Sequence, residues 1–319
     1  MVTMKFLKLS RTPIWVPSLA AGFAVGAIAM HPAMLQLPFT ELLRDSIGGA
    51  MLEYLGYAVG FFLLFRAVLH RWIKPRLLAR KRWPKPSQVA REIMFSTSAQ
   101  FTFMAVGIWL TFSAQAEAAM MYTDIGTHGW PYLIFTTFLL FVIDDTYFYW
   151  THRMLHHRTM FERFHRVHHE SVDPTPFTSY SFHPVETIII GMGGLVFIPF
   201  FMLMPWHPAA VAAFGLGNIL FNVIGHLGYE LYPARWNRIP LLRWKTPAMH
   251  HYLHHQMVGG NYGLYFRWWD KLCGTEFKDF EARYDKFFAA KPTQTPENLR
   301  TLSTLTSDAN SSQSKFERI

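Results

Sequence analysis

Six long apolar stretches constrain this 319-residue chain more than any other feature of its sequence. A helix that crosses a bilayer needs about 20 mostly apolar residues. Only 16% of the residues are charged, fewer than in a typical soluble domain, and 17% are aromatic. We therefore expect an integral membrane protein that crosses the bilayer several times. The candidate spans are residues 14–30, 46–65, 93–121, 130–142, 187–204 and 209–224.

The positions of Lys and Arg predict how these spans are oriented. Residues 66–91 hold nine Lys and Arg, and the N-terminus is also basic. Because such residues are retained on the cytoplasmic side during insertion, we expect both segments there. Counting crossings then returns Trp150 to the same surface. The alternative for residues 14–30 is a cleaved signal peptide, which would leave the basic loop on the opposite side.

The net charge of +9 also bears on partners and location. The basic residues lie beside apolar spans, so they fit anionic lipid headgroups better than nucleic acid, for which the sequence has no motif. We expect a multi-pass protein of a bacterial inner membrane rather than of the endoplasmic reticulum, with its active site at the cytoplasmic face.

Sixteen histidines are the second unusual feature, and most of them follow Trp150 in groups. Residues three and four apart share one face of a helix, so each group is expected to present its imidazoles as one cluster. The isolated histidines, at 31, 70, 128 and 207, are expected to have no such role. The groups contain His152, His156 and His157, then His165, His168 and His169, then His250, His251, His254 and His255, with His183 and His226 between them.

The number of clustered histidines predicts more than one metal ion. A single zinc takes three or four protein ligands, and eight or nine imidazoles exceed that need. Imidazole suits iron, zinc, copper and nickel alike, so the donor type leaves the metal open. The single Cys273 excludes a Cys-rich metal site and an intramolecular disulfide. The nearby carboxylates are Asp144, Asp145, Glu170, Glu186 and Glu230.

The order and flanking residues of these groups carry a resemblance to a known family. The motifs are HRxxH at 152–156, FHxxHH at 164–169, HPxE at 183–186, HHxxHH at 250–255, NYG at 261–263, and WD with GT at 269–275. Together they resemble the fatty acid hydroxylase and sterol desaturase superfamily over residues 145–275. Residues 174–177 are similar to the C-5 sterol desaturase branch, and residues 225–229 to the methylsterol oxidase branch.

The resemblance implies a centre of two iron ions that uses O2 to hydroxylate or desaturate a C–H bond of a lipid. The lipid would be a sterol-like molecule, an acyl chain or a lipid headgroup, and a ferredoxin or a cytochrome b5-like protein would supply electrons. The resemblance implies no catalytic residue beyond the metal ligands. Those ligands are His152, His156, His165, His168, His169, His226, His251, His254 and His255.

Five further residues stand beside this ligand set. His157 is a rival of His156, because the first motif occurs in the superfamily with either spacing. His183 and His250 are expected to face the substrate or to support a ligand. Glu186 and Glu230 are candidates to orient an imidazole through its free N–H, or are ordinary helix charges.

We expect an all-α membrane bundle capped by a cytoplasmic, histidine-rich helical lobe formed by residues 151–186 and 225–285. Its parts are N-terminal membrane helices with the basic loop (1–92), the hydroxylase-like domain (93–285) and a disordered tail (286–319). Two other functions are open. A histidine-rich membrane metal-handling protein would place ionisable groups inside several spans. A zinc-dependent membrane hydrolase would pair an open coordination position with a carboxylate base.

Overall fold

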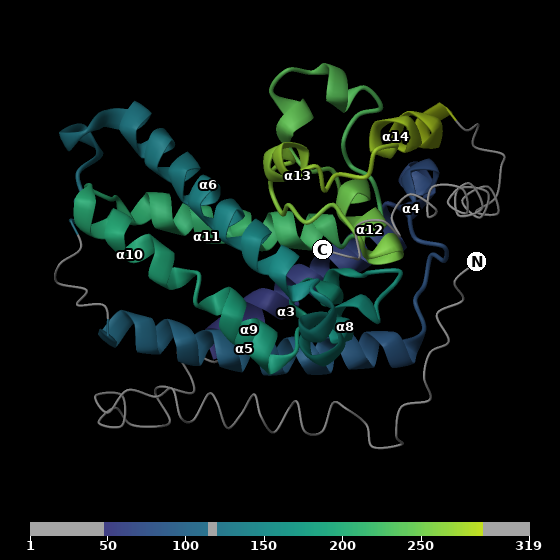
Figure 1. Cartoon of the computed structure of the whole chain (residues 1–319), viewed down its shortest axis with the longest axis horizontal. Helices are drawn as coiled ribbons and strands as arrows, with labels where there is room; N and C mark the ends of the chain where they lie inside the picture. Colours follow the sequence, from purple (N-terminus) through teal and green to yellow (C-terminus); the bar gives the residue numbers. More distant parts are fainter. Residues whose placement is uncertain (1–47, 114–119, 290–319) are drawn as a thin grey trace.

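The computed structural model describes residues 48–113 and 120–289 (Figure 1). Within these ranges the chain is helical and contains no β-strand, as the sequence predicts, with three isolated bridges between loops. The predicted span at 14–30 lies outside the described residues, as does most of the predicted tail. The last helix runs through Ala289, so the first residues of the segment 286–319 are helical.

Six long or membrane-embedded helices build the body of the molecule. They are α3 (Gly48–Leu63), α5 (Pro86–Ser113), α6 (Gly129–Leu155), α9 (Pro184–Gly191), α10 (Gly194–Leu203) and α11 (Pro208–Gly225). The other α-helices are α4 (His70–Ile73), α7 (Arg158–Met160), α8 (Arg166–His169), α12 (Ala248–Met257), α13 (Trp268–Cys273) and α14 (Phe280–Ala289). Two π-helical turns, η3 (Leu64–Val68) and η7 (Phe161–His165), and five 3-10 turns, η4 (Lys74–Arg76), η6 (Ile125–Thr127), η8 (Pro176–Tyr180), η9 (Trp236–Arg238) and η10 (Leu242–Trp244), complete the order.

Three helices of the described chain are long and apolar enough to cross a membrane. They are α6, the continuous pair α9 and α10 (Pro184–Leu203), and α11. Their outer faces expose large apolar side chains, among them Trp130 at 64% and Leu203 at 77%. Soluble monomers rarely gather such side chains on their surface, so the chain is an integral membrane protein.

The other two predicted spans that the structure describes, at least in part, differ from this set. The apolar helix Tyr54–Val68 is shorter than the three candidates. Helix α5 also crosses the predicted domain boundary at 92/93, and polar side chains such as Ser96 and Thr102 interrupt its apolar run. Ser96 donates a hydrogen bond to the carbonyl oxygen of Phe177 at 2.8 Å, so this polar face binds the neighbouring turn η8.

Packing of the helices separates the apolar body from the histidine-bearing elements. Figure 1 shows α6, α10 and α11 extending to the left, α8, α12 and α13 nearer the middle, and α14 toward the right. Leu140, Phe197 and Trp206 form a core between α6, α10 and the turn before α11. At the other end, a second core that includes Trp236 and Tyr284 lies beneath α12 and α14. The C-terminal end of α6 meets the second half of α12, where Nε2 of His156 lies 3.2 Å from that of His254.

Candidate metal centre

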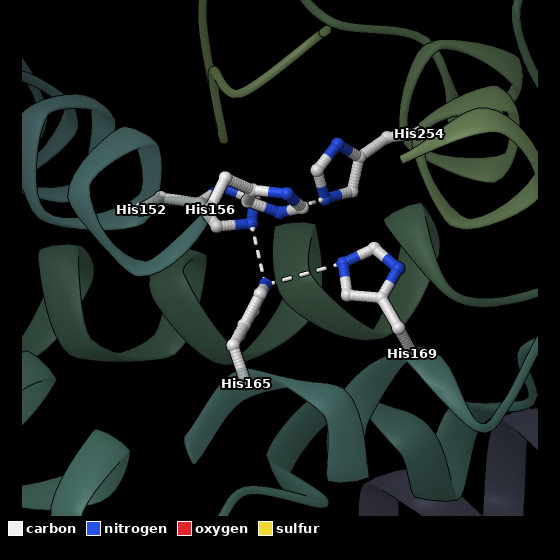
Figure 2. A group of neighbouring side chains, drawn as sticks. All are labelled: His152, His156, His165, His169 and His254. Atoms are coloured by element: carbon white, nitrogen blue, oxygen red, sulfur yellow. Dashed lines mark hydrogen bonds between the residues drawn. The ribbon is translucent and has the colours of Figure 1, made fainter. Parts of the chain in front are cut away.

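The structure gathers nine histidines into two adjacent groups. The five-histidine cluster consists of His152, His156, His165, His169 and His254, and the four-histidine cluster consists of His168, His226, His251 and His255. Within each cluster, one ring nitrogen from every residue lies within 4.8 Å of the others. Figure 2 shows the five-histidine cluster, whose rings converge from three separate segments of the chain. These are the same nine residues that the resemblance implied as ligands.

Each HxxHH motif contributes to both clusters rather than to one. His165 and His169 belong to the five-histidine cluster, while His168 belongs to the other. In the late motif the split is reversed, because His251 and His255 lie in the four-histidine cluster and His254 in the five-histidine cluster. At about 100° per residue, side chains four apart differ by only about 40°, whereas consecutive residues diverge by about 100°. The expectation that each motif points one way is therefore wrong.

Imidazoles within each cluster face one another through Nε2. In the five-histidine cluster, Nε2 of His165 lies 3.2 Å from that of His152 and 3.1 Å from that of His169. Nε2 of His156 lies 3.2 Å from that of His254.

The four-histidine cluster is built in the same way. Nε2 of His251 lies 2.9 Å from that of His226 and 3.2 Å from that of His255. Nε2 of His168 lies 3.4 Å from that of His226. The same ring atom is therefore presented inward in both clusters.

Hydrogen bonds at Nδ1 determine the tautomer of several rings. His152 contacts the carbonyl oxygen of Tyr262 at 2.9 Å, and His254 that of Gly260 at 2.7 Å. His226 contacts the carbonyl oxygen of Asn222 at 2.8 Å. A carbonyl oxygen only accepts, so each Nδ1 must carry the proton and each Nε2 must present a lone pair.

The shortest of these Nδ1 contacts belongs to His165. Its Nδ1 lies 2.6 Å from Oε1 of Glu186, a side chain with no exposed surface. A carboxylate that accepts from the outer nitrogen of a metal-binding imidazole orients the ring and increases its basicity. Glu186 thus has the contact that was considered for it from the sequence.

The arrangement of lone pairs fits a bound cation. Two unprotonated Nε2 atoms about 3 Å apart repel each other unless a positive charge lies between them. Protonation does not supply that charge, because burial lowers the pKa of His165, His168 and His169 well below the usual value. Burial likewise lowers the pKa of His226 to about 4. Neutral imidazole nitrogens converging at two points are the donor set that a borderline metal such as iron or zinc binds.

A loop between α12 and α13 supplies two of the carbonyl acceptors, and Asp270 holds it in place. Oδ1 of Asp270 accepts from the backbone N–H of Tyr262 at 2.8 Å and from the Thr275 hydroxyl at 2.7 Å. Its Oδ2 accepts from the backbone N–H of Gly263 at 2.7 Å. A Cβ on Gly260 would collide with the carbonyl oxygen of Thr275, so this close approach requires glycine.

Asp145 on α6 binds the far end of the same loop. It accepts from the backbone N–H of Tyr265 at 2.7 Å and from the indole N–H of Trp268 at 2.9 Å. A fully buried carboxylate within an apolar helix is costly unless its oxygens are hydrogen-bonded, and here they are. Helix α6, which carries His152 and ends just before His156, is thereby joined directly to the loop that orients His152 and His254.

Comparison with known proteins agrees with the resemblance that the sequence motifs carry. Residues 137–275 match the sequence model of the fatty acid hydroxylase family. The chain is 34% identical to methylsterol monooxygenase 1 of Danio rerio over 162 residues, which cover 51% of this chain and 53% of that protein. It is 29% identical to a Delta(7)-sterol 5(6)-desaturase of Gibberella zeae over 247 residues, or 75% and 71% of the two chains. Residues 137–275, which include all nine cluster histidines, therefore resemble the fatty acid hydroxylase family and its sterol-modifying members.

Three further comparisons define the extent of the similarity. Lathosterol oxidase of Rattus norvegicus is 27% identical over 240 residues, covering 75% of this chain and 77% of that protein. The chain spans about half the length of the methylsterol monooxygenases that it matches. No solved structure shows significant similarity to it.

The remaining residues proposed from the superfamily motifs lie outside both clusters. His157 is exposed, so His156 is the residue of that pair that enters a cluster. His183 accepts from the backbone N–H of Val185 at 3.2 Å and caps the start of α9. His250 is fully buried, with Nε2 3.7 Å from Oδ2 of Asp270. Glu230 accepts backbone N–H groups from Tyr232 and Met249, both at 2.8 Å, rather than contacting an imidazole.

Sequence reasoning about the superfamily did not assign roles to the residues that hold the loop. Asp270, Gly263 and Thr275 were visible in the NYG and WD–GT motifs, but only as marks of resemblance. Asp145 carried a signal of its own, because a carboxylate in an apolar span indicates a specific partner. Gly260 and Asn222 act through backbone carbonyls, which no side-chain pattern reveals.

Proposed function

We propose that this protein oxidises a C–H bond of a lipid with O2, using two iron ions held by the two histidine clusters. The observation that carries the proposal is the convergence of nine imidazoles, eight of them buried and that of His156 partly buried, on two adjacent points, with Nδ1 contacts orienting four of them. Overall, one lipid C–H, O2, two electrons and two protons would give a hydroxylated lipid and water. Desaturation would instead remove two hydrogens and release two waters.

The chemistry divides between the metal and the chain. Bound iron would supply the oxidising power that no side chain has. The clusters would hold the ions, and the Nδ1 partners of four rings would keep Nε2 of those rings directed at the ions. A small cavity of about 10 Å³, large enough for about one water, is lined by histidines of both clusters, including His152 and His226. Apolar Phe148, Phe182 and Leu264 line the same space and would limit the access of water to it.

A sterol-like lipid is the substrate class that we propose first. The relatives reported above are named for methylsterol, Delta(7)-sterol and lathosterol substrates. Helices α6 and α11 run from the apolar body into the clusters, so a lipid could reach the site without leaving an apolar environment.

An external protein would supply the two electrons, and we propose an acidic ferredoxin or a cytochrome b5-like donor. Arg71, Lys74, Lys81 and Lys85 are exposed on the predicted cytoplasmic loop and would attract it. Arg82 is unsuitable as a test residue because its Nε donates to the carbonyl oxygen of Arg66 at 2.7 Å. Charge reversal of Lys81 and Lys85 should slow reduction in low salt, and the difference should shrink in high salt.

The cytoplasmic placement of the site is also part of this proposal and depends on the charge distribution of the loops. The relatives named here come from eukaryotes, so they give no support to the bacterial inner membrane that we expected. Cysteine labelling of exposed positions in intact vesicles, at Lys81 and at Arg158, would determine the side of the membrane directly.

The test of the proposed function combines metal analysis with product analysis. Purified protein should contain two irons per chain, and with a reduced donor and O2 it should convert lathosterol or a 4-methylsterol to a product heavier by 16 or lighter by 2 mass units. One tightly bound zinc with ester or amide cleavage would instead indicate the hydrolase. Loosely exchangeable ions without turnover would indicate a metal-handling protein.

A further inference from the structure

A larger cavity adjoins the small cavity at the clusters. It has a volume of about 320 Å³, within the range of small-molecule sites. At roughly 30 Å³ for a water-sized group, it has room for about ten such groups. Side chains of α3, α5, α6, α9, α11 and η8 line it, together with the backbone at the start of α10, so it lies among the apolar helices. Five residues line both cavities: Phe148, Phe182, Ile190, Asn222 and Leu264.

The walls of this larger cavity are mainly apolar and aromatic. Phe103, Phe148 and Phe214 face it from three different helices. The break between α9 and α10 forms another wall, where a Cβ on Gly193 would lie 2.8 Å from the ring of Tyr147. Glycine there lets the tyrosine ring lie against the backbone, which shapes the cavity beside the reaction site.

Asn222 is the polar member of the five residues shared by the two cavities. It lies one turn before His226 on α11, and its backbone carbonyl accepts from Nδ1 of that histidine. Among the described residues, its side-chain amide forms no hydrogen bond, although the residue is only 7% exposed. One residue thus has a backbone group bound to a ligand histidine and a free amide facing the space next to it.

Asn218 lies one turn further from the clusters on the same face of α11, and its side-chain amide is hydrogen-bonded within the protein. Its Nδ2 donates to the Tyr265 hydroxyl at 2.6 Å and to Oδ2 of Asp144 at 3.3 Å. Its Oδ1 accepts from the Tyr180 hydroxyl at 3.4 Å. The hydrogen-bonding capacity of Asn218 is therefore used within the protein, whereas that of Asn222 is available to a ligand.

An unpaired amide in an apolar cavity carries a cost that a suitable ligand removes. Leaving a buried polar group without a partner forfeits the hydrogen bonds that it makes with water. A saturated hydrocarbon chain would bring this penalty upon entering, because it would displace water from the amide without replacing its hydrogen bonds. A hydroxyl group can both donate to Oδ1 and accept from Nδ2, so it matches the amide.

We infer that the cavity binds a lipid carrying a hydroxyl group close to the carbon that is oxidised, and that the side chain of Asn222 hydrogen-bonds this hydroxyl. The inference rests on the proposed function for the identity of the reaction. It adds the lipid group that is recognised, a hydroxyl, and the residue that recognises it, Asn222. It favours a hydroxylated ring lipid over an acyl chain whose polar end would lie far from the clusters. Asn222 is a positioning residue here, acting on the substrate beside the small cavity.

The test compares two ligands that differ by one hydroxyl. The iron-loaded full-length protein in detergent micelles, without reductant, is titrated with radiolabelled cholestanol and then competed with unlabelled cholestanol, with cholestane and with stearate. The wild type should bind cholestanol about tenfold more tightly than cholestane, the ratio that about 1.4 kcal/mol produces. Asn222→Leu should reduce this ratio to about twofold or less, mainly by weakening cholestanol binding.

Two matched variants separate hydrogen bonding from packing. Asn222→Ser keeps a hydroxyl that can bind the ligand, so most of the ratio should be retained. Ile219→Leu changes the shape of the same cavity wall without changing polarity, and it should alter both affinities together. Comparing ratios between variants cancels the partition of each lipid into the micelle.

The inference is overturned if Asn222→Leu keeps the wild-type ratio, or if the wild type binds stearate or cholestane as tightly as cholestanol. Iron content and circular dichroism of the same preparations show that each variant is folded. These measurements also keep the two proposals apart. A protein with two irons and lipid turnover but no hydroxyl preference would contradict the inference alone, while a hydroxyl preference without bound iron would contradict the proposed function.

Discussion

The two histidine clusters are built from the same residue type but are supported differently. In the five-histidine cluster, His152, His165 and His254 each have an Nδ1 hydrogen bond to a carbonyl or carboxylate oxygen. The four-histidine cluster has such a contact from His226. Nδ1 of His251 and of His255, like that of His169 in the first cluster, is buried without a partner among the described residues. The first cluster is therefore preorganised by hydrogen bonds, and the second depends more on helix geometry.

This difference suggests an order of metal binding. A ring whose Nδ1 proton is already bound by an acceptor presents Nε2 as a lone pair before the metal arrives. A ring without an acceptor is free to carry its proton on Nε2 instead, and that proton must move when a metal binds. We expect the five-histidine cluster to fill first and to hold its ion more tightly.

Removal of a histidine from each cluster should give the largest effects. His254→Ala should lose the more tightly held ion, and His251→Ala the other, with each variant holding about one iron per chain at most. Turnover should fall by more than about 100-fold in both, because each removes a ligand rather than its support. Metal analysis after dialysis against a chelator checks this, and two irons in either variant would contradict the assignment of that cluster.

Glu186→Gln should give the next largest effect, confined to the five-histidine cluster. The carboxylate accepts from His165 at 2.6 Å, and loss of such a partner costs about 10- to 100-fold in metal affinity. Glu230→Gln is the matched control, because Glu230 contacts backbone N–H groups. It should lower the melting temperature but leave both affinities close to wild type. Equal loss of iron in the two variants would remove the distinction drawn between these carboxylates.

Asp270→Asn should have a smaller effect that is transmitted through the loop. An amide can replace one acceptor oxygen but not both, so at least one backbone N–H of Tyr262 or Gly263 loses its partner, at about 1–3 kcal/mol of stability. Iron affinity should fall several-fold at the five-histidine cluster and not at the other. Asp279→Asn, which weakens the pair between the exposed Asp279 and the buried Arg283 away from the loop, serves as the control. Weakening of both clusters alike would show that the loop has no selective role.

The smallest effect concerns the stability of the metal-free protein against pH. Burial lowers the pKa of seven cluster histidines outside the membrane helices well below the usual value, and that of His226 to about 4. Between about pH 6.5 and 4 the unfolded chain therefore binds protons that the folded chain does not, and stability falls as pH falls.

Two buried carboxylic acids outside the membrane helices act in the opposite direction. Burial raises the pKa of Glu230 to about 7 and that of Asp270 to about 6, so the folded state takes up these protons first on acidification. Eight histidines outnumber two carboxylic acids, and the net result should be a lower melting temperature at pH 5 than at pH 7. A melting temperature that rises on acidification would contradict the burial of the neutral imidazoles.

The sequence predicts the membrane helices and the set of clustered histidines because both depend on local patterns. Apolar length alone predicts α6, α10 and α11, and three- and four-residue spacing selects the histidines. The division between clusters was not predicted, because three- and four-residue spacings were treated alike, although consecutive histidines diverge by about 100° around a helix. His168 and His254 each lie on the side opposite to the rest of their motif.

Contacts that run through the backbone were equally inaccessible from the sequence. The carbonyl oxygens of Gly260 and Tyr262 support two histidines, but any residue has a carbonyl. The equal ranking of Glu186 and Glu230 also reflects this limit, since their partners are set by tertiary packing. The uncommitted amide of Asn222 could be recognised only once the cavity that it faces was known.

The most direct test of the two-cluster account is anomalous diffraction from crystals of the protein, recorded on both sides of the iron absorption edge. The account predicts two iron peaks per chain, one among Nε2 of His152, His156, His165, His169 and His254 and the other among Nε2 of His168, His226, His251 and His255. A single peak, or peaks that appear at the zinc edge instead, would contradict it.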